Sequence, residues 1–102
     1  MSEFSTELFM PTDSMEAVQK LLAAFESLPR VKMVRRVDET TVEARTGVSF
    51  KSWGETVDAT VTAVESGSRV AITSRSRLQT TLVDYGQNRE NVEQVVRRLN
   101  AV

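Results

Sequence analysis

The sequence lacks both cysteine and histidine in all of its 102 residues. No disulfide can form, and zinc, copper and iron–sulfur sites lose the thiolate and imidazole ligands that usually hold them. Cys–His and Ser–His–Asp catalysis are excluded in their usual form. We therefore expect no metal and no cofactor, and we rank binding or interaction above catalysis.

The sequence also has no excess of charge of either sign. Its 13 lysine and arginine residues and 14 aspartate and glutamate residues give a net charge of −1. Proteins that bind nucleic acid usually carry a basic excess, because contacts to phosphate supply most of their affinity. The charge balance therefore argues against nucleic acid as a partner.

Long apolar runs are absent as well. The longest are a few residues, far short of the roughly 20 that a transmembrane helix needs. The segment Met1–Met10 contains Glu3 and Glu7 and no basic residue, whereas a secretory signal begins with positive charge and continues with an apolar stretch. We expect a cytoplasmic protein without a membrane span.

The residues that are present are typical of one globular domain, which we expect to span residues 1–102. Apolar residues make up 40% of the chain. In five short segments they alternate with polar residues, a period of two that predicts β-strands. The predicted strands are Phe4–Met10, Val31–Val37, Thr40–Thr46, Thr56–Val64 and Arg69–Arg75.

Two other segments have apolar residues at spacings of three and four, which predicts amphipathic helices. The first follows Asp13, which forms a capping pair with Glu16, and it ends before Pro29. Its apolar stripe contains Met15, Val18, Leu21, Leu22, Phe25 and Leu28. The second helix is capped by Asn88, and its stripe contains Val92, Val95, Val96 and Leu99.

Short turns join the second to the fifth predicted strand, so these strands must form an antiparallel meander. We expect Gly67 to supply the positive φ in the turn before the last of them. The fourth strand directs Val57, Ala59, Val61 and Ala63 to one face and threonines mostly to the other. The predicted fold class is α+β with the order β-α-β-β-β-β-α, an antiparallel sheet with two helices packed on one face.

This element order resembles that of the TATA-box-binding-protein repeat. It also resembles a shortened form of the helix-grip fold of birch-pollen-allergen and START-type lipid-binding proteins, which implies an apolar cavity between the sheet and the last helix. A local resemblance concerns Ile72-Thr-Ser-Arg-Ser-Arg77 and Asp84-Tyr-Gly-Gln-Asn88. These segments are similar to the end of a bacterial family of unknown function, whose members carry Ser-x-Ser-Arg and then Asp, Gly and Asn before the last helix. That family implies no activity.

Three aromatic residues are candidate site residues. Phe50 lies close to Trp53, which is the only tryptophan of the sequence. On the functional interpretation, both residues form the lip of a ligand site or an anchor for a partner. On the alternative interpretation, they close one end of the core. Tyr85 precedes the last helix, whose N-terminus can hold an anion. An enzyme would use the adjacent Asp84 as a general base with Arg77 as a charge clamp. The alternative is a simple turn at this strand-to-helix junction.

Arginines are the second group of candidates. Arg75 and Arg77 end the fifth predicted strand and, with Arg45 and Arg69, would place several arginines on one sheet face. That face either binds phosphate or an acidic partner, or its arginines pair with nearby carboxylates such as Glu43 or Asp58. The denser basic run Arg30, Lys32, Arg35 and Arg36 either steers an anionic partner or protects an edge strand from aggregation.

These observations predict a small binding module. The main hypothesis is an apolar small molecule between the sheet and the last helix, where the inward residues Ala44, Ala59 and Ala63 would leave room. The ligand-binding candidates are Phe50, Trp53, Arg75, Arg77 and Tyr85. The alternative is a protein–protein module, such as a homodimer joined through an open sheet edge. Binding of nucleic acid or an anion through the arginine-bearing face is the third hypothesis.

Overall fold

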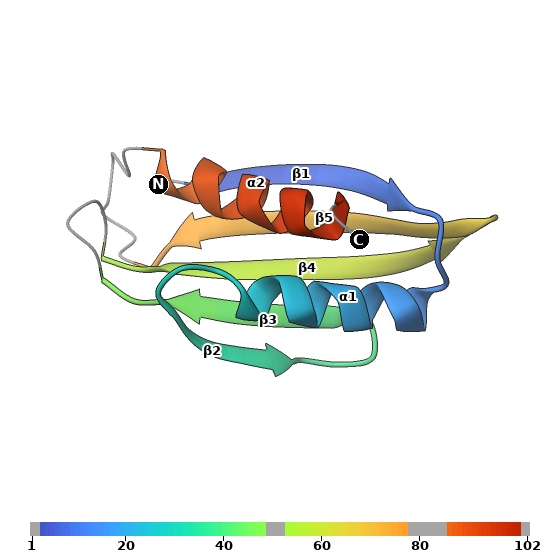
Figure 1. Ribbon diagram of the computed structural model, residues 1–102, viewed down its shortest axis with the longest axis horizontal. Helices are drawn as coiled ribbons and strands as arrows, with labels where there is room; N and C mark the ends of the chain where they lie inside the picture. Colours follow the sequence, from blue (N-terminus) through green and yellow to red (C-terminus); the bar gives the residue numbers. More distant parts are fainter. Residues whose placement is uncertain (1–2, 49–52, 78–85, 101–102) are drawn as a thin grey trace.

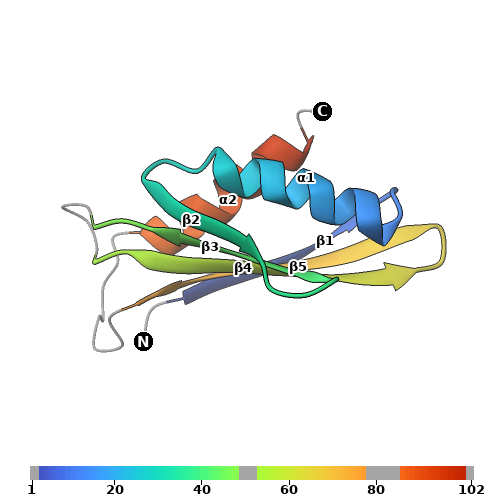
Figure 2. The same cartoon turned by 90° about the horizontal axis from the view of Figure 1, so that it is seen from below.

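The computed structural model describes residues 3–48, 53–77 and 86–100. Five strands form one antiparallel sheet, and two helices pack against one of its faces (Figures 1 and 2). The elements are β1 (Glu3–Met10), α1 (Ser14–Glu26), β2 (Val31–Arg36), β3 (Thr41–Thr46), β4 (Glu55–Val64), β5 (Gly67–Ser76) and α2 (Gln87–Asn100). The predicted α+β class and element order are confirmed.

The strand order in the sheet is β1-β5-β4-β3-β2. Strands β2 to β5 follow one another as the predicted meander, and every neighbouring pair is antiparallel. The first strand closes the sheet at the far side, because β1 pairs with β5 from Glu3 opposite Arg75 to Met10 opposite Ser68. The two sheet edges are therefore β1 and β2.

Each helix covers its own part of the sheet. α1 lies over β2, β3 and β4, and α2 lies along β1 and β5 (Figure 1). The predicted cap of α1 is confirmed, since the Asp13 Oδ1 accepts a hydrogen bond from the Glu16 backbone N–H at 2.8 Å. Neither described helix is long and apolar enough to cross a membrane.

The core lies between the two layers and contains most of the predicted apolar residues. Two predictions are wrong. Met15 is 72% exposed. The buried stripe of α1 includes the small residues Ala17 and Ala24, which the prediction did not count, and Met15 lies outside this stripe. Ala63 is also exposed, because the β4–β5 hairpin extends beyond the end of the helix layer (Figure 1). The buried stripe of α1 contains Ala17, Val18, Leu21, Ala24 and Phe25.

The turn between β4 and β5 also corrects a prediction. The residue with positive φ is Ser66, at 69°, and not Gly67. Glycine is needed at position 67 for a different reason: a Cβ there would meet the Met10 carbonyl oxygen and lie 2.7 Å from Cζ of the Phe9 ring. The absence of a side chain at Gly67 lets β1 approach the hairpin.

Candidate functional site

A cluster of buried polar side chains lies where α2 begins. It is formed at the end of the sheet where β3 and β5 end and β4 begins, because the inward-facing rows of these strands change from apolar to polar residues there. Its members are all 4% exposed or less: Thr46, Glu55, Ser74, Ser76, Gln87, Asn88 and Asn91. We call these seven residues the polar cluster.

Glu55 is the charged member of the polar cluster and is fully buried. Its Oε1 accepts hydrogen bonds from the Thr46 Oγ1 at 2.8 Å and from the Asn91 Nδ2 at 3.0 Å. The Glu55 backbone N–H in turn donates to the Thr46 Oγ1 at 2.9 Å. A buried carboxylate is costly unless donors surround it, so these contacts join β3, β4 and α2 around one group.

The amide side chains of α2 complete the cluster. Ser74 Oγ donates to Asn88 Oδ1 at 2.8 Å, and Asn88 Nδ2 donates to Ser76 Oγ at 3.2 Å. Asn91 Nδ2 also donates to Ser74 Oγ at 3.2 Å, and Gln87 Nε2 donates to Asn91 Oδ1 at 3.0 Å. The first turns of α2 are thereby fixed to the end of β5.

The prediction that Asn88 caps the last helix is wrong. α2 begins at Gln87, so Asn88 is its second residue, and its side chain bonds β5. The Asn88 side chain would have to bind backbone N–H groups of the helix to act as a cap, and here its oxygen and nitrogen bind Ser74 and Ser76 of the sheet instead. The segments that carry the family resemblance meet here, because Ser74 and Ser76 of the first both form hydrogen bonds with Asn88 of the second.

Trp53 and Arg77 lie together at this end of the sheet. The Arg77 backbone N–H donates to the Gly54 carbonyl at 3.1 Å, and its Nη2 lies 3.5 Å from the Trp53 carbonyl oxygen. Trp53 is 64% exposed, so it does not close the core, and that interpretation is wrong for it. Phe50, Tyr85 and Asp84 lie outside the described residues.

Arg75 lies apart from them, on the open face of the sheet. Its Nη2 is 3.8 Å from Asp58 Oδ2, and on the same face Arg35 Nε donates to Glu43 Oε1 at 2.9 Å. Burial raises the pKa of Asp58, the Arg75 guanidinium opposes that rise, and Glu43 adds to it. Arg75 therefore pairs with a carboxylate as one interpretation predicted, and the mixed charge of this face does not favour nucleic acid.

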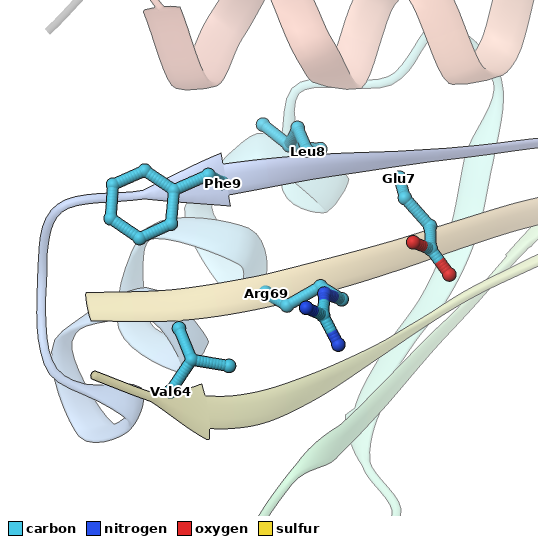
Figure 3. A pocket seen from close by; sticks show the side chains of 5 residues that line it. All are labelled: Glu7, Leu8, Phe9, Val64 and Arg69. Atoms are coloured by element: carbon cyan, nitrogen blue, oxygen red, sulfur yellow. The ribbon is translucent and has the colours of Figure 1, made fainter. Parts of the chain in front are cut away.

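A shallow hollow of about 280 Å³ lies at the hairpin end of the sheet. Phe9, Val64 and Arg69 line it together with Glu7 and Leu8 (Figure 3). Phe9 is 55% exposed. This residue was not among the sequence candidates, because the alternation of Phe4–Met10 places it on the outward side of the strand and indicates nothing more about it.

A larger groove runs between β1 and the outer flank of α2. It measures about 410 Å³ and is lined by Phe4, Thr6, Val92, Glu93, Val96 and Arg97. We call it the β1–α2 groove. The Arg89 guanidinium lies 5.6 Å from the centre of the Phe4 ring, and Arg89 Nε donates to Glu93 Oε2 at 3.0 Å. A cation–π contact and an ion pair therefore join Arg89 to two residues that line the groove.

This groove is not where the sequence placed the open space. Ala44 and Ala59 are fully buried in the core beneath the helices, and they do not line the groove. The predicted apolar stripe of α2 divides instead: Val92 and Val95 are buried, whereas Val96 is half-buried and lines the groove. The open space is thus formed between α2 and the edge strand β1 and not beneath the helices.

Solved structures with the same fold include three that cover nearly the whole chain. The Aha1 dimer from Colwellia psychrerythraea is 12% identical with a TM-score of 0.64, and the match covers 99% of this chain and 96% of that one. Ara h 8.0201 is 14% identical with a TM-score of 0.57, covering 98% and 95%. TTHA0849 from Thermus thermophilus is 16% identical with a TM-score of 0.55, covering 98% and 95%. At these identities the likeness shows the fold alone, and it confirms the predicted resemblance to helix-grip proteins.

A comparison with curated proteins finds no match. The model of a family described as "Protein of unknown function (DUF1499)" matches residues 3–99. This range includes both segments on which the predicted resemblance to a family of unknown function rested, and that resemblance is confirmed.

Proposed function

The chain belongs to the family described as protein of unknown function (DUF1499), and we propose that this protein binds a small, mainly apolar molecule in the β1–α2 groove. The observation that carries the proposal is the groove itself. Its volume of about 410 Å³ falls within the range of roughly 300 to 1,000 Å³ that is usual for small-molecule sites.

The lining of the groove indicates the chemistry of the ligand. Phe4 and Val96 supply apolar surface from the strand and the helix, and Thr6, Glu93 and Arg97 add polar groups. Val92 also lines the groove, although its side chain is buried. Sites for small molecules commonly combine an apolar lining with a few polar groups that set orientation. A ligand with an apolar body and one polar end matches this arrangement.

The helix-grip fold supports the same function, because longer proteins of this fold open an apolar cavity between the sheet and the last helix. Here the space is a groove at the edge of the sheet. Trp53 and Arg77 are two of the residues predicted to bind a ligand, and they do not line the groove. Their role in binding stays a separate prediction.

A neutral apolar fluorophore, N-phenyl-1-naphthylamine, tests the proposal. We expect its fluorescence to rise on binding and the amide resonances of Thr6, Val92 and Val96 to shift in NMR spectra. The variant Val96→Glu should bind the probe about tenfold more weakly, because the bound probe would desolvate a carboxylate.

Met15→Glu is the matched control, since it introduces the same charge at an exposed position on the other helix. Equal probe affinities for Val96→Glu and Met15→Glu would contradict the proposal. So would NMR shifts confined to the hollow around Phe9 and Val64.

A further inference from the structure

The two edges of the sheet differ in chemistry. β2 carries Lys32, Arg35 and Arg36, and its register against β3 shifts between Val31 and Met33. Charged side chains and register irregularities are the devices with which natural sheets discourage the addition of another strand. The basic run that was predicted to protect an edge strand lies on an edge.

β1 lacks the basic side chains and the register shift of β2. It contains no lysine, arginine or proline, and its register with β5 is continuous along its whole length. Within the described part of the chain β5 is its one strand neighbour, so its outer edge is unpaired. Such an edge presents a row of backbone donors and acceptors to any extended segment.

The side chains of β1 have different surroundings on the two faces of the sheet. Phe4 and Thr6 line the β1–α2 groove, whereas Ser5, which bonds Thr73, lies on the open face. Glu3 and Glu7 share the face of Ser5, are exposed and are the only charged residues of β1. A strand added at this edge would therefore place alternate side chains over an apolar groove and beside two carboxylates.

We infer that β1 binds an extended peptide as a sixth strand, one that carries apolar residues at alternate positions and basic residues between them. The apolar residues lie over Phe4 and Thr6, and the basic residues lie opposite Glu3 and Glu7. Backbone pairing supplies affinity in this mode of recognition, and the alternating side chains supply specificity. The inference shares Phe4 and Thr6 with the proposed small-molecule site. It also needs the strand edge and the two carboxylates, which that site does not need, so either can fail alone.

Charge complementarity favours such a peptide over a second copy of the chain. When two β1 strands pair antiparallel with their groove faces on the same side, Glu3 and Glu7 of one copy come opposite or diagonal to those of the other. Like charges at these cross-strand positions are destabilising. The two carboxylates thus oppose self-pairing and favour a basic partner.

Two capped eight-residue peptides test the inference, one of alternating valine and lysine and one of alternating valine and glutamate. We expect the lysine peptide to bind about tenfold more tightly, since two attractive cross-strand pairs replace two repulsive ones. With the lysine peptide bound, hydrogen exchange of β1 amides should slow, and that of β2 amides should not change.

Charge reversal separates the inference from a general electrostatic effect. The variant Glu3→Lys with Glu7→Lys should prefer the glutamate peptide, a switch that a misfolded protein could not produce. The matched control is Glu26→Lys with Glu39→Lys, which makes the same change in net charge at two exposed positions and should keep the original preference. Equal affinity for both peptides, or protection at β2, overturns the inference. A mass that doubles with concentration, with β1 protected in the absence of peptide, also overturns it and identifies a second copy as the occupant.

Discussion

Replacing Asn91 by alanine should remove the central link between α2 and the polar end of the sheet. Asn91 is 1% exposed, and its side chain makes three hydrogen bonds. Its Nδ2 donates to Glu55 at 3.0 Å and to Ser74 at 3.2 Å, and its Oδ1 accepts from Gln87 at 3.0 Å. All three partners are buried, so each loses a hydrogen bond in a place where water does not readily replace it.

The expected cost follows from these contacts. A neutral hydrogen bond contributes about 1 kcal/mol net, and one to a charged group about 2 kcal/mol, so the loss is about 4 kcal/mol. Small domains are stable by about 5 to 15 kcal/mol. In a chain of this size 1 kcal/mol shifts the melting temperature by about 4 to 8 °C. Asn91→Ala should therefore lower the melting temperature by about 15 °C or more.

Urea unfolding followed by circular dichroism measures this change as a free energy. The control is Asn100→Ala, since Asn100 is exposed at the end of the same helix, and an exposed substitution there should alter stability by about 0.5 kcal/mol or less. The comparison also cancels part of the gain in helix propensity that alanine brings. If Asn91→Ala comes within about 1 kcal/mol of the control, the polar cluster does not hold the helix, and the reasoning is refuted.

Two further predictions concern a carboxylate and a pair of glycines. Because burial raises the pKa of Asp58 above 3.8, its charged form is disfavoured in the fold, and stability falls as the pH rises through and above that value. Asp58→Asn should therefore increase the free energy of unfolding at pH 7, and this gain in stability should disappear below pH 3.8. If urea unfolding shows the same gain in acid, the pKa of Asp58 is not raised by folding. Gly54 and Gly86 both have positive φ, but only at Gly54 would a Cβ meet other atoms, namely the Arg77 guanidinium and the Thr46 carbonyl oxygen at 2.8 Å. In urea unfolding, Gly54→Ala should cost more than Gly86→Ala, and equal costs would show that backbone strain alone matters.

The pattern of side chains predicted the elements of this fold well. Strict alternation along β4 identified the strand and its inward residues Val57, Ala59 and Val61, although not the outcome at Ala63, because a strand with one buried face repeats every two residues. The position of β1 could not be predicted in the same way. Its partner β5 is far along the chain, and nothing in Phe4–Met10 specifies which sheet edge it joins. The meander of the other strands follows from short turns, which set neighbours locally.

Glu55 and Ser76 lie one residue beyond the predicted strands Thr56–Val64 and Arg69–Arg75, whereas Thr46 and Ser74 lie inside predicted strands. The alternation was followed through apolar residues only, so no buried polar cluster was predicted. Glu55 has the same parity as Val57, and Ser74 and Ser76 have the parity of Ile72, so each continues an inward-facing row. Asn91 likewise precedes Val92 on the sheet-facing side of α2. Extending both periods through polar residues would have placed these side chains in the interior, although not their hydrogen-bond partners.

The polar cluster also bears on why the β1–α2 groove exists. Burial of Val92, Val95 and Leu99 favours one side of the helix facing the sheet. Hydrogen bonds restrict its orientation further, because they require particular distances and angles. Bonds from Asn88 and Asn91 to the sheet therefore fix the rotation of α2 about its axis. That rotation buries Val92 and leaves Val96 on the outer flank, facing the space beside β1. The polar residues at one end of the helix and its buried apolar stripe together determine which surface the protein presents along its free strand edge.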